Sequence, residues 1–150
     1  MRLELTKRAD YAIRAVVALA AAGPDEPISV TRLAAERAIP ARFLRQVMAD
    51  LVGGGIVDGL AGRTGGYRLA RSAATITILE VIEAIEGDSR RQTCVLRGGP
   101  CQLHGTCDVH RVFAATQEGM IRELGGATIA SLPQSIDAAT AGSSRTLGRA

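Results

Sequence analysis

A chain of 150 residues with 47% hydrophobic content can bury one core, which predicts a single folded domain with at most a small appended element. Only 3% of the residues are aromatic and none is tryptophan, which excludes a row of rings for stacking single-stranded bases. The longest apolar run, residues 15–22, is too short to cross a bilayer, and no secretory cleavage pattern is visible, so we expect a cytoplasmic protein.

The net charge of +3 is unevenly distributed along the chain. Residues 1–71 hold eleven Lys or Arg against seven Asp or Glu, whereas residues 72–150 hold seven against eight. A basic first half joined to a near-neutral second half indicates an anion-binding module followed by a part with another role.

The first predicted element is a helix over residues 6–21. Apolar side chains recur at helical spacing, Thr6 suits the N-cap, and Gly23 with Pro24 ends the helix. Its polar face is predicted to carry Lys7, Arg8, Asp10 and Arg14. Asp10 and Arg14 are four residues apart, a spacing that allows an ion pair on the helix surface.

Two short helices are predicted next, over residues 30–37 and 40–52. Ser29 suits the N-cap of the first, and Pro40 suits the first turn of the second because its missing N–H has no partner there anyway. The second helix turns its apolar positions inward and leaves four polar side chains outward: Arg42, Arg45, Gln46 and Asp50. Arg can pair with guanine and Gln with adenine in the major groove. The pattern fits a helix-turn-helix, and it also fits an ordinary helical hairpin with a solvated face.

A β-hairpin is predicted directly after these helices. Residues 56–60 and 67–69 have strand character, and the glycine-rich turn between them carries Arg63 at its tip. A hairpin with a basic tip in this place favours the wing of a winged helix, because such a tip can reach phosphate or the minor groove. The sequence GRTGG lacks the spacing of a nucleotide-binding loop.

Two further amphipathic helices are predicted. Thr77 and Glu80 form a capping box for a helix over residues 78–86, which Gly87 ends. A longer helix over residues 108–124 carries an apolar stripe at Val109, Val112, Phe113, Thr116, Met120 and Leu124. This stripe exceeds what a small winged helix needs, which predicts a partner helix in a dimer. Residues 133–150 are small and polar, and we expect a disordered tail.

All three cysteines, Cys94, Cys101 and Cys107, lie within fourteen residues between these two helices, and His110 follows them. The spacing C-x6-C-x5-C-x2-H lacks the C-x2-C knuckle of common zinc sites. Wide gaps suit a larger object such as an iron-sulfur cluster, whose fourth ligand must then be another residue. The alternatives are buried cysteines or a metal-free thiol switch. No partner for a nucleophilic cysteine is recognisable, so we do not expect an enzyme.

The chain resembles the Rrf-two family of winged-helix regulators over about residues 1–132, in the segments TKRADYAIRAV, IPARFLRQVMADL, GRTGGYRLAR, ITILEVIEAIEG and CVLRGGPCQLHGTCDVH. The resemblance implies a mainly α fold with a small β-hairpin: a winged helix-turn-helix over residues 1–74, then a linker helix, a cluster-binding loop and a long C-terminal dimerisation helix over residues 75–132. It also implies a homodimer on a roughly palindromic DNA operator, with one iron-sulfur cluster (2Fe-2S or 4Fe-4S) per subunit.

Carried over by position, the resemblance implies that Cys94, Cys101 and Cys107 are the cluster ligands. Two residues match the fourth ligand of different family members. His110 falls where the iron-sulfur cluster regulator uses a histidine, and Asp10 falls where the nitric-oxide-sensitive repressor uses a carboxylate of the partner subunit. One more residue separates the first two cysteines here than in those two proteins.

For DNA, we predict that Arg42, Arg45 and Gln46 read bases, while Lys7, Arg8 and Arg63 contact phosphate. Arg45 stands where the iron-sulfur cluster regulator has a glutamate that reads bases, so a different operator is expected. The predicted function is a dimeric transcriptional regulator whose operator affinity is controlled by an iron-sulfur cluster. The alternative is a winged-helix regulator with a metal-free thiol switch or a structural zinc in the cysteine loop.

Overall fold

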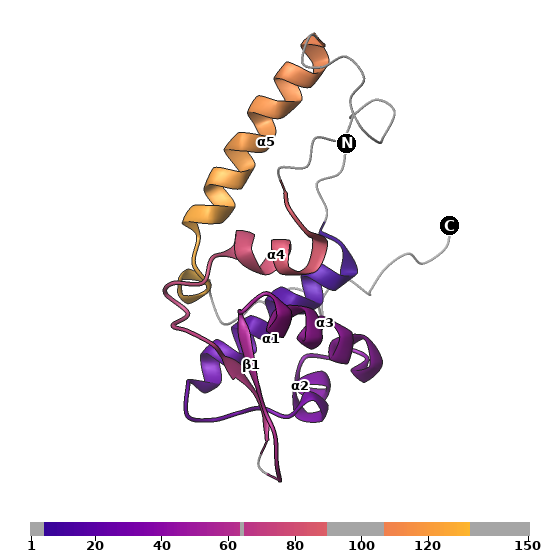
Figure 1. Ribbon diagram of the computed structural model, residues 1–150, viewed down its shortest axis with the longest axis vertical. Coiled ribbons are helices and arrows are strands. Elements are labelled where there is room, and N and C mark those ends of the chain that lie inside the picture. Colours follow the sequence, from indigo (N-terminus) through magenta and orange to yellow (C-terminus); the bar gives the residue numbers. More distant parts are fainter. Residues whose placement is uncertain (1–4, 64, 90–106, 133–150) are drawn as a thin grey trace, which may run out of the picture.

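The computed structural model describes residues 5–63, 65–89 and 107–132. Figure 1 shows a helical body with a protruding hairpin at one end and one long helix at the other. In chain order the elements are α1 (Lys7–Ala22), α2 (Val30–Glu36), α3 (Ala41–Gly53), β1 (Val57–Leu60), β2 (Gly66–Leu69), α4 (Ile78–Glu86), α5 (Asp108–Gly126) and the short 3-10 helix η1 (Ile129–Ser131). The predicted fold class, mainly α with a small β-hairpin, is confirmed.

Helices α1, α2 and α4 begin at residues whose side chains cap them. The Thr6 hydroxyl accepts a hydrogen bond from the Ala9 amide at 3.2 Å, and Ser29 does the same for α2. At α4 the predicted capping box is complete, because Thr77 and Glu80 each bond the other's backbone amide. Pro40 differs from the prediction, since it is the N-cap of α3 instead of its first helical residue.

The core lies where α1, α3 and α4 meet. Each helix contributes fully buried side chains to one cluster, such as Leu19 from α1, Leu44 and Met48 from α3, and Val81 from α4. Ile129 of η1 joins the same cluster, so the end of the described chain also packs on the body. The inward apolar positions predicted for α3 are all buried.

Arg14 corrects the predicted polar face of the first helix. Its side chain is only 8% exposed. Its guanidinium donates to the carbonyl oxygen of Arg37 at the end of α2, and it lies 3.6 Å from the Asp10 carboxylate. A buried charge is tolerated when such partners compensate its lost hydration. Arg14 therefore fastens α1 to the turn between α2 and α3, where Ala38 has a φ of 51°.

The hairpin is a two-stranded antiparallel sheet in which Val57 pairs with Leu69 and Leu60 with Gly66. An isolated bridge between Ile28 and Tyr67 attaches it to the segment before α2. Only glycine fits at Gly66, because a Cβ there would lie 2.7 Å from the Ile28 backbone. Three helices followed by a hairpin packed in this way form a winged helix-turn-helix.

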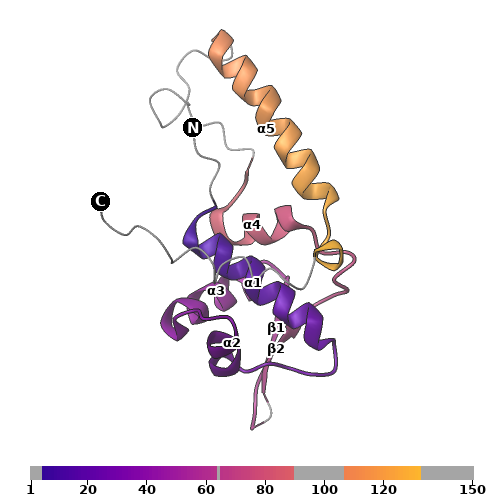
Figure 2. The ribbon, with the colours of Figure 1, turned by 180° about the vertical axis from the view of Figure 1, so that it is seen from behind.

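Helix α5 leaves the body as a long rod, which Figures 1 and 2 show from opposite sides. Its last turn is anchored beside α4, where the Ile78 amide donates to the Ala127 carbonyl and the Ile129 amide to the Ile76 carbonyl. The helix continues through Gly125 and Gly126, two residues beyond its predicted end at residue 124. None of the described helices is long and apolar enough to span a membrane. The predicted tail, residues 133–150, lies outside the described residues.

Candidate nucleic-acid interface and metal site

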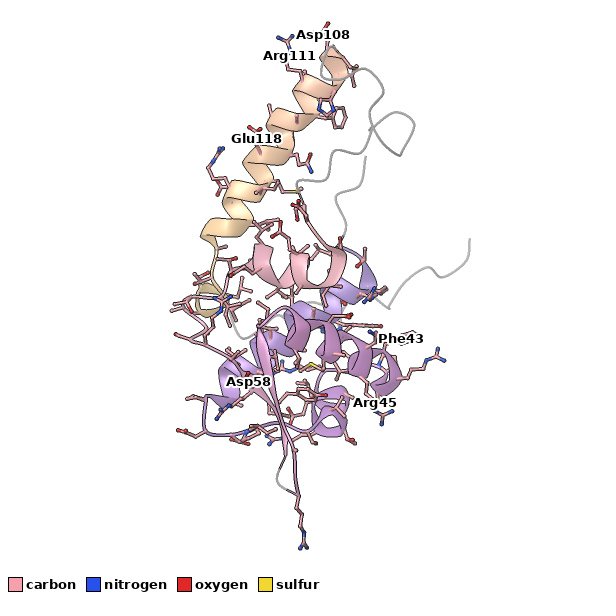
Figure 3. All side chains as sticks on the ribbon, viewed as in Figure 1. Phe43, Arg45, Asp58, Asp108, Arg111 and Glu118 are labelled. Atoms are coloured by element: carbon pink, nitrogen blue, oxygen red, sulfur yellow. The ribbon has the colours of Figure 1, made fainter. Side chains whose placement is uncertain are left out.

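Helix α3 presents a polar outer face. Arg42, Arg45 and Gln46 are exposed, as predicted, because the inward positions of the same helix are taken by the core. Figure 3 shows the labelled Arg45 on the outer side of α3, away from α4 and α5. Among the described residues, no hydrogen bond or ion pair engages Arg45. Its guanidinium is therefore available to a ligand at this face.

Phe43 is a member of this surface that the sequence analysis missed. Its ring is 45% exposed, and the Arg42 guanidinium lies over it at 4.4 Å from the ring centre. This stacking holds Arg42 against the start of α3 by a cation–π interaction. The sequence did contain a signal, because Phe43 falls outside the inner apolar stripe of the helix.

Gln46 and Arg8 both bind Asp50. The Gln46 amide nitrogen Nε2 lies 3.2 Å from Oδ1 of Asp50, and the Arg8 guanidinium bonds Oδ2 of the same carboxylate. Arg8 belongs to the first turn of α1, so this contact joins two helices. Arg8, predicted to contact phosphate, is thus placed on a carboxylate in the protein alone. Lys7, its neighbour, is exposed and makes no ion pair among the described residues.

The hairpin carries its charge at the end. Arg63 is exposed in the turn between β1 and β2, while Arg68 lies across from Asp58 in the sheet, 3.9 Å away. Gly62, with a φ of 108°, provides the backbone conformation that the turn needs. The hairpin projects away from the body (Figure 1), so the Arg63 cation is held at a distance from the core.

Part of the cysteine site can be placed. Cys107 is the N-cap of α5 and is half-buried, and His110 lies in the first turn of the same helix. Residues three apart share one face of a helix, so these two donors face the same side. Cys94 and Cys101 lie outside the described residues.

His110 opens onto a groove between α4 and α5. The groove has a volume of about 600 Å³, and its apolar lining includes Leu79 and Ile121. Gln117 on the same side donates to the Ser89 carbonyl at 2.5 Å, and the Ser89 amide in turn donates to Glu83 at 3.1 Å. The residue that leads into the cysteine loop is thereby bonded to both helices.

Asp10 lies on α1 beside Arg14, and its side chain is one-third exposed. Within the described part of one chain, no three His, Cys, Asp or Glu side chains come together as a metal site would require. Cys107 and His110 nevertheless fit a thiophilic metal group, because a thiol and an imidazole on one helix turn are suitable donors for iron.

A family model described as "Iron-dependent Transcriptional regulator" matches residues 5–135. The chain belongs to the Rrf2 family, named Rrf-two above. An rrf2-like helix-turn-helix regulator of Rhodobacter capsulatus is 30% identical over 118 residues, which cover 73% of this chain and 79% of that protein. The regulator IscR of Klebsiella pneumoniae is 27% identical, with 87% of this chain and 79% of that protein covered.

Solved structures share the fold. CymR, the global cysteine regulator of B. subtilis, superposes with a TM-score of 0.72 at 19% identity, covering 87% of this chain and 95% of that one. IscR of T. potens gives a TM-score of 0.68 at 22% identity, covering 96% and 94%. Family and relatives establish a DNA-binding transcriptional regulator and not an enzyme.

Proposed function

We propose that this Rrf2 protein is a homodimer whose affinity for its DNA operator is controlled by an iron-sulfur cluster in the cysteine loop. One observation carries the proposal: the three-cysteine run ends at Cys107, the N-cap of α5, one helix turn from His110. His110 in turn lines the groove between α4 and α5. The family description as an iron-dependent regulator supports the same conclusion.

The DNA-binding surface is the outer face of α3 together with the hairpin. Arg42, Arg45 and Gln46 would meet base edges in the major groove, where Arg suits guanine and Gln suits adenine. Arg63 at the hairpin tip and Lys7 at the start of α1 would supply positive charge for the phosphates, whereas Arg8 is paired with Asp50 in the protein alone. These elements belong to residues 1–74, which we propose as the DNA-binding unit.

The dimer surface is the apolar stripe of α5. Val109, Val112, Phe113 and Met120 are exposed, and Val112 reaches 62%. At 100° per residue these four positions share one face of the helix, whereas the buried Ile121 lies on another, toward Leu79. A second copy of α5 would cover the stripe, so residues 75–132 would combine dimerisation with cluster binding. Two recognition helices related by a twofold axis then match a roughly palindromic operator.

The cluster ligands would be Cys94, Cys101 and Cys107 with either His110 or Asp10. His110 is supported by its place on the same helix face as Cys107 and by the open groove beside it. Asp10 would come from the partner subunit and would have to share its carboxylate with Arg14. When bound, the cluster would supply a redox-active group, and its loss or modification in response to iron supply, oxygen or nitric oxide would be the signal.

Cluster state would reach the DNA through helix packing. Ser89 is bonded to α4 and α5, and the Thr6 hydroxyl at the start of α1 donates to Glu86 at the end of α4 at 2.7 Å. A shift of the loop would therefore move α1, and with it α3, which packs against α1. A coupling of about 1–3 kcal/mol corresponds to roughly a 5- to 150-fold change in affinity.

The decisive experiment is anaerobic purification followed by an absorption spectrum and iron and sulfide counts per chain, for the wild type and for Asp10→Ala and His110→Ala. We expect visible charge-transfer bands, and the variant that loses them names the fourth ligand. DNA affinity of the loaded and the cluster-free protein is then compared at one salt concentration. Equal affinities contradict control by the cluster, and a colourless, iron-free, DNA-binding protein favours a thiol switch or a structural zinc instead.

A further inference from the structure

The Asp50 carboxylate connects the start of α1 to the reading face of α3. Its two oxygens have different partners: Oδ1 accepts from the Gln46 amide at 3.2 Å, and Oδ2 accepts from the Arg8 guanidinium. The Asp50 side chain is 25% exposed and that of Arg8 is 52% exposed. The three side chains form a chain of hydrogen bonds across the surface where α1 meets α3.

This chain of bonds determines which way the Gln46 amide faces. A carboxylate only accepts hydrogen bonds, so the amide nitrogen of Gln46 must point toward Asp50. The amide oxygen and the second N–H then point outward as one acceptor beside one donor. That pair of groups matches the N6 donor and N7 acceptor that adenine presents in the major groove.

Arg8 neutralises and positions the Asp50 carboxylate. An isolated surface ion pair contributes little to stability, but an unpaired carboxylate on a DNA-binding helix would repel the phosphates that the surface must approach. The Arg8 guanidinium neutralises the Asp50 charge and holds the carboxylate in place. The positive charge of Arg8 is consequently paired with Asp50 and not with a DNA phosphate.

We propose that Asp50 and Arg8 are positioning residues that set the base preference of Gln46 toward adenine. The inference rests on the proposed function of α3 as the base-reading helix, and it adds two residues that touch no base themselves. It also gives Arg8 a role other than phosphate contact.

The test uses the full-length protein, purified anaerobically, and a pool of DNA duplexes with a randomised central segment. Sequencing the bound fraction gives the preferred sequence of the wild type. Affinities for that duplex and for its single-base-pair variants are then measured at several salt concentrations. The variants are Gln46→Ala, Asp50→Ala, Arg8→Ala and the double variant Gln46→Ala/Asp50→Ala. Lys7→Ala is the matched control, because Lys7 adjoins Arg8 and makes no ion pair in the described chain. Thermal unfolding verifies that each variant is folded.

We expect Gln46→Ala to reduce discrimination at one A·T pair of each half-site by about 5- to 150-fold. Asp50→Ala and Arg8→Ala should reduce discrimination at that same pair, and the double variant should lose no more than Gln46→Ala alone. Lys7→Ala should weaken every duplex alike and lower the salt slope by about 0.9.

Two results overturn the inference. One is an Asp50→Ala protein that discriminates at that A·T pair as strongly as the wild type does. The other is an Arg8→Ala protein that weakens on all duplexes alike with a reduced salt slope, which would make Arg8 a phosphate contact. A wild-type protein that selects no sequence is a different result, because it refutes base reading by α3 and therefore the proposed function itself.

Discussion

Helices α4 and α5 are both amphipathic, but they bury their apolar faces to different extents. Helix α4 has nine residues and buries Leu79, Val81, Ile82 and Ile85, whereas α5 has nineteen and buries only Ile121. Helix α4 lies against α1 and α3, while α5 extends beyond the body (Figure 2). An apolar face at helical spacing therefore indicates that a helix packs against something, but it does not indicate whether that partner belongs to the same chain.

The largest effect is expected in α4, the helix whose apolar face is buried within one chain. Ile85→Ala in α4 removes a buried side chain from the core cluster and should lower the free energy of unfolding by about 2–5 kcal/mol. Urea or thermal unfolding measures it. Glu118→Ala, an exposed change on α5 outside the apolar stripe, is the control and should stay within about 0.5 kcal/mol. A stability of Ile85→Ala equal to the wild type would refute the described core.

The second prediction addresses the exposed stripe of α5. Val112→Glu places a carboxylate where the partner helix should pack, and burying that charge should raise the dimer dissociation constant by at least about 100-fold. Sedimentation or light scattering at several concentrations measures it. Arg111→Glu adds a carboxylate to the same helix outside the stripe and should leave the dimer intact. If Val112→Glu remains as dimeric as the wild type, the stripe is not the interface.

The third prediction distinguishes base contacts from phosphate contacts on the DNA-binding surface. Arg45→Ala should cost about 1–3 kcal/mol of discrimination at the base pair it contacts, because its guanidinium is available on the outer face of α3. Arg63→Ala should instead weaken all sequences alike and reduce the salt slope by about 0.9. Binding curves on matched and mismatched duplexes distinguish the two. An unchanged preference in Arg45→Ala would place the base-reading face of α3 elsewhere.

The smallest effect on stability is expected at the capping box of Thr77 and Glu80, where α4 begins. Burial alone would raise the pKa of Glu80, but hydrogen bonds from the Thr77 backbone, the Arg71 guanidinium and the Thr77 hydroxyl outweigh it and lower that pKa below 4.5. The folded state therefore gains stability from the Glu80 charge above about pH 4.5, and loses it as the pH falls through the lowered pKa.

Thr77→Ala should cost about 1 kcal/mol at neutral pH through the lost cap. Glu80→Gln should remove part of the decline in stability below pH 4.5, which unfolding curves across pH 3–7 would show. Ser72→Ala, in the preceding turn, is a control that removes one hydrogen bond from the Ala74 amide and leaves the capping box in place. A Glu80→Gln protein with the wild-type pH dependence would contradict the lowered pKa.

Features that depend on neighbours in sequence were predictable. The capping box at Thr77 and Glu80, the inward apolar positions of α3 and the hairpin around Gly62 follow from spacing and turn chemistry within a few residues. The exposed positions of Arg42, Arg45 and Gln46 follow from the same helical period. The ligand set of the cysteine loop remains a prediction, because Cys94 and Cys101 lie outside the described residues.

Features that join segments distant in sequence were not predictable. Arg14 was expected on a polar face, yet its side chain is buried and its guanidinium reaches the Arg37 carbonyl at the end of α2. The contact of Arg8 with Asp50, forty-two residues further along the chain, was not predicted either. Periodicity assigns a side chain to a face of its helix, but it does not say what covers that face.

The sequence by itself determined the elements, their caps, the clustered cysteines and the family, because each of these is written in local order and residue type. Only the tertiary structure decided which charges are bonded within the protein and which remain available. It also left the α5 stripe uncovered in one chain, with Val112 exposed. The physical reason is that contacts between distant segments depend on how the helices pack around the shared core.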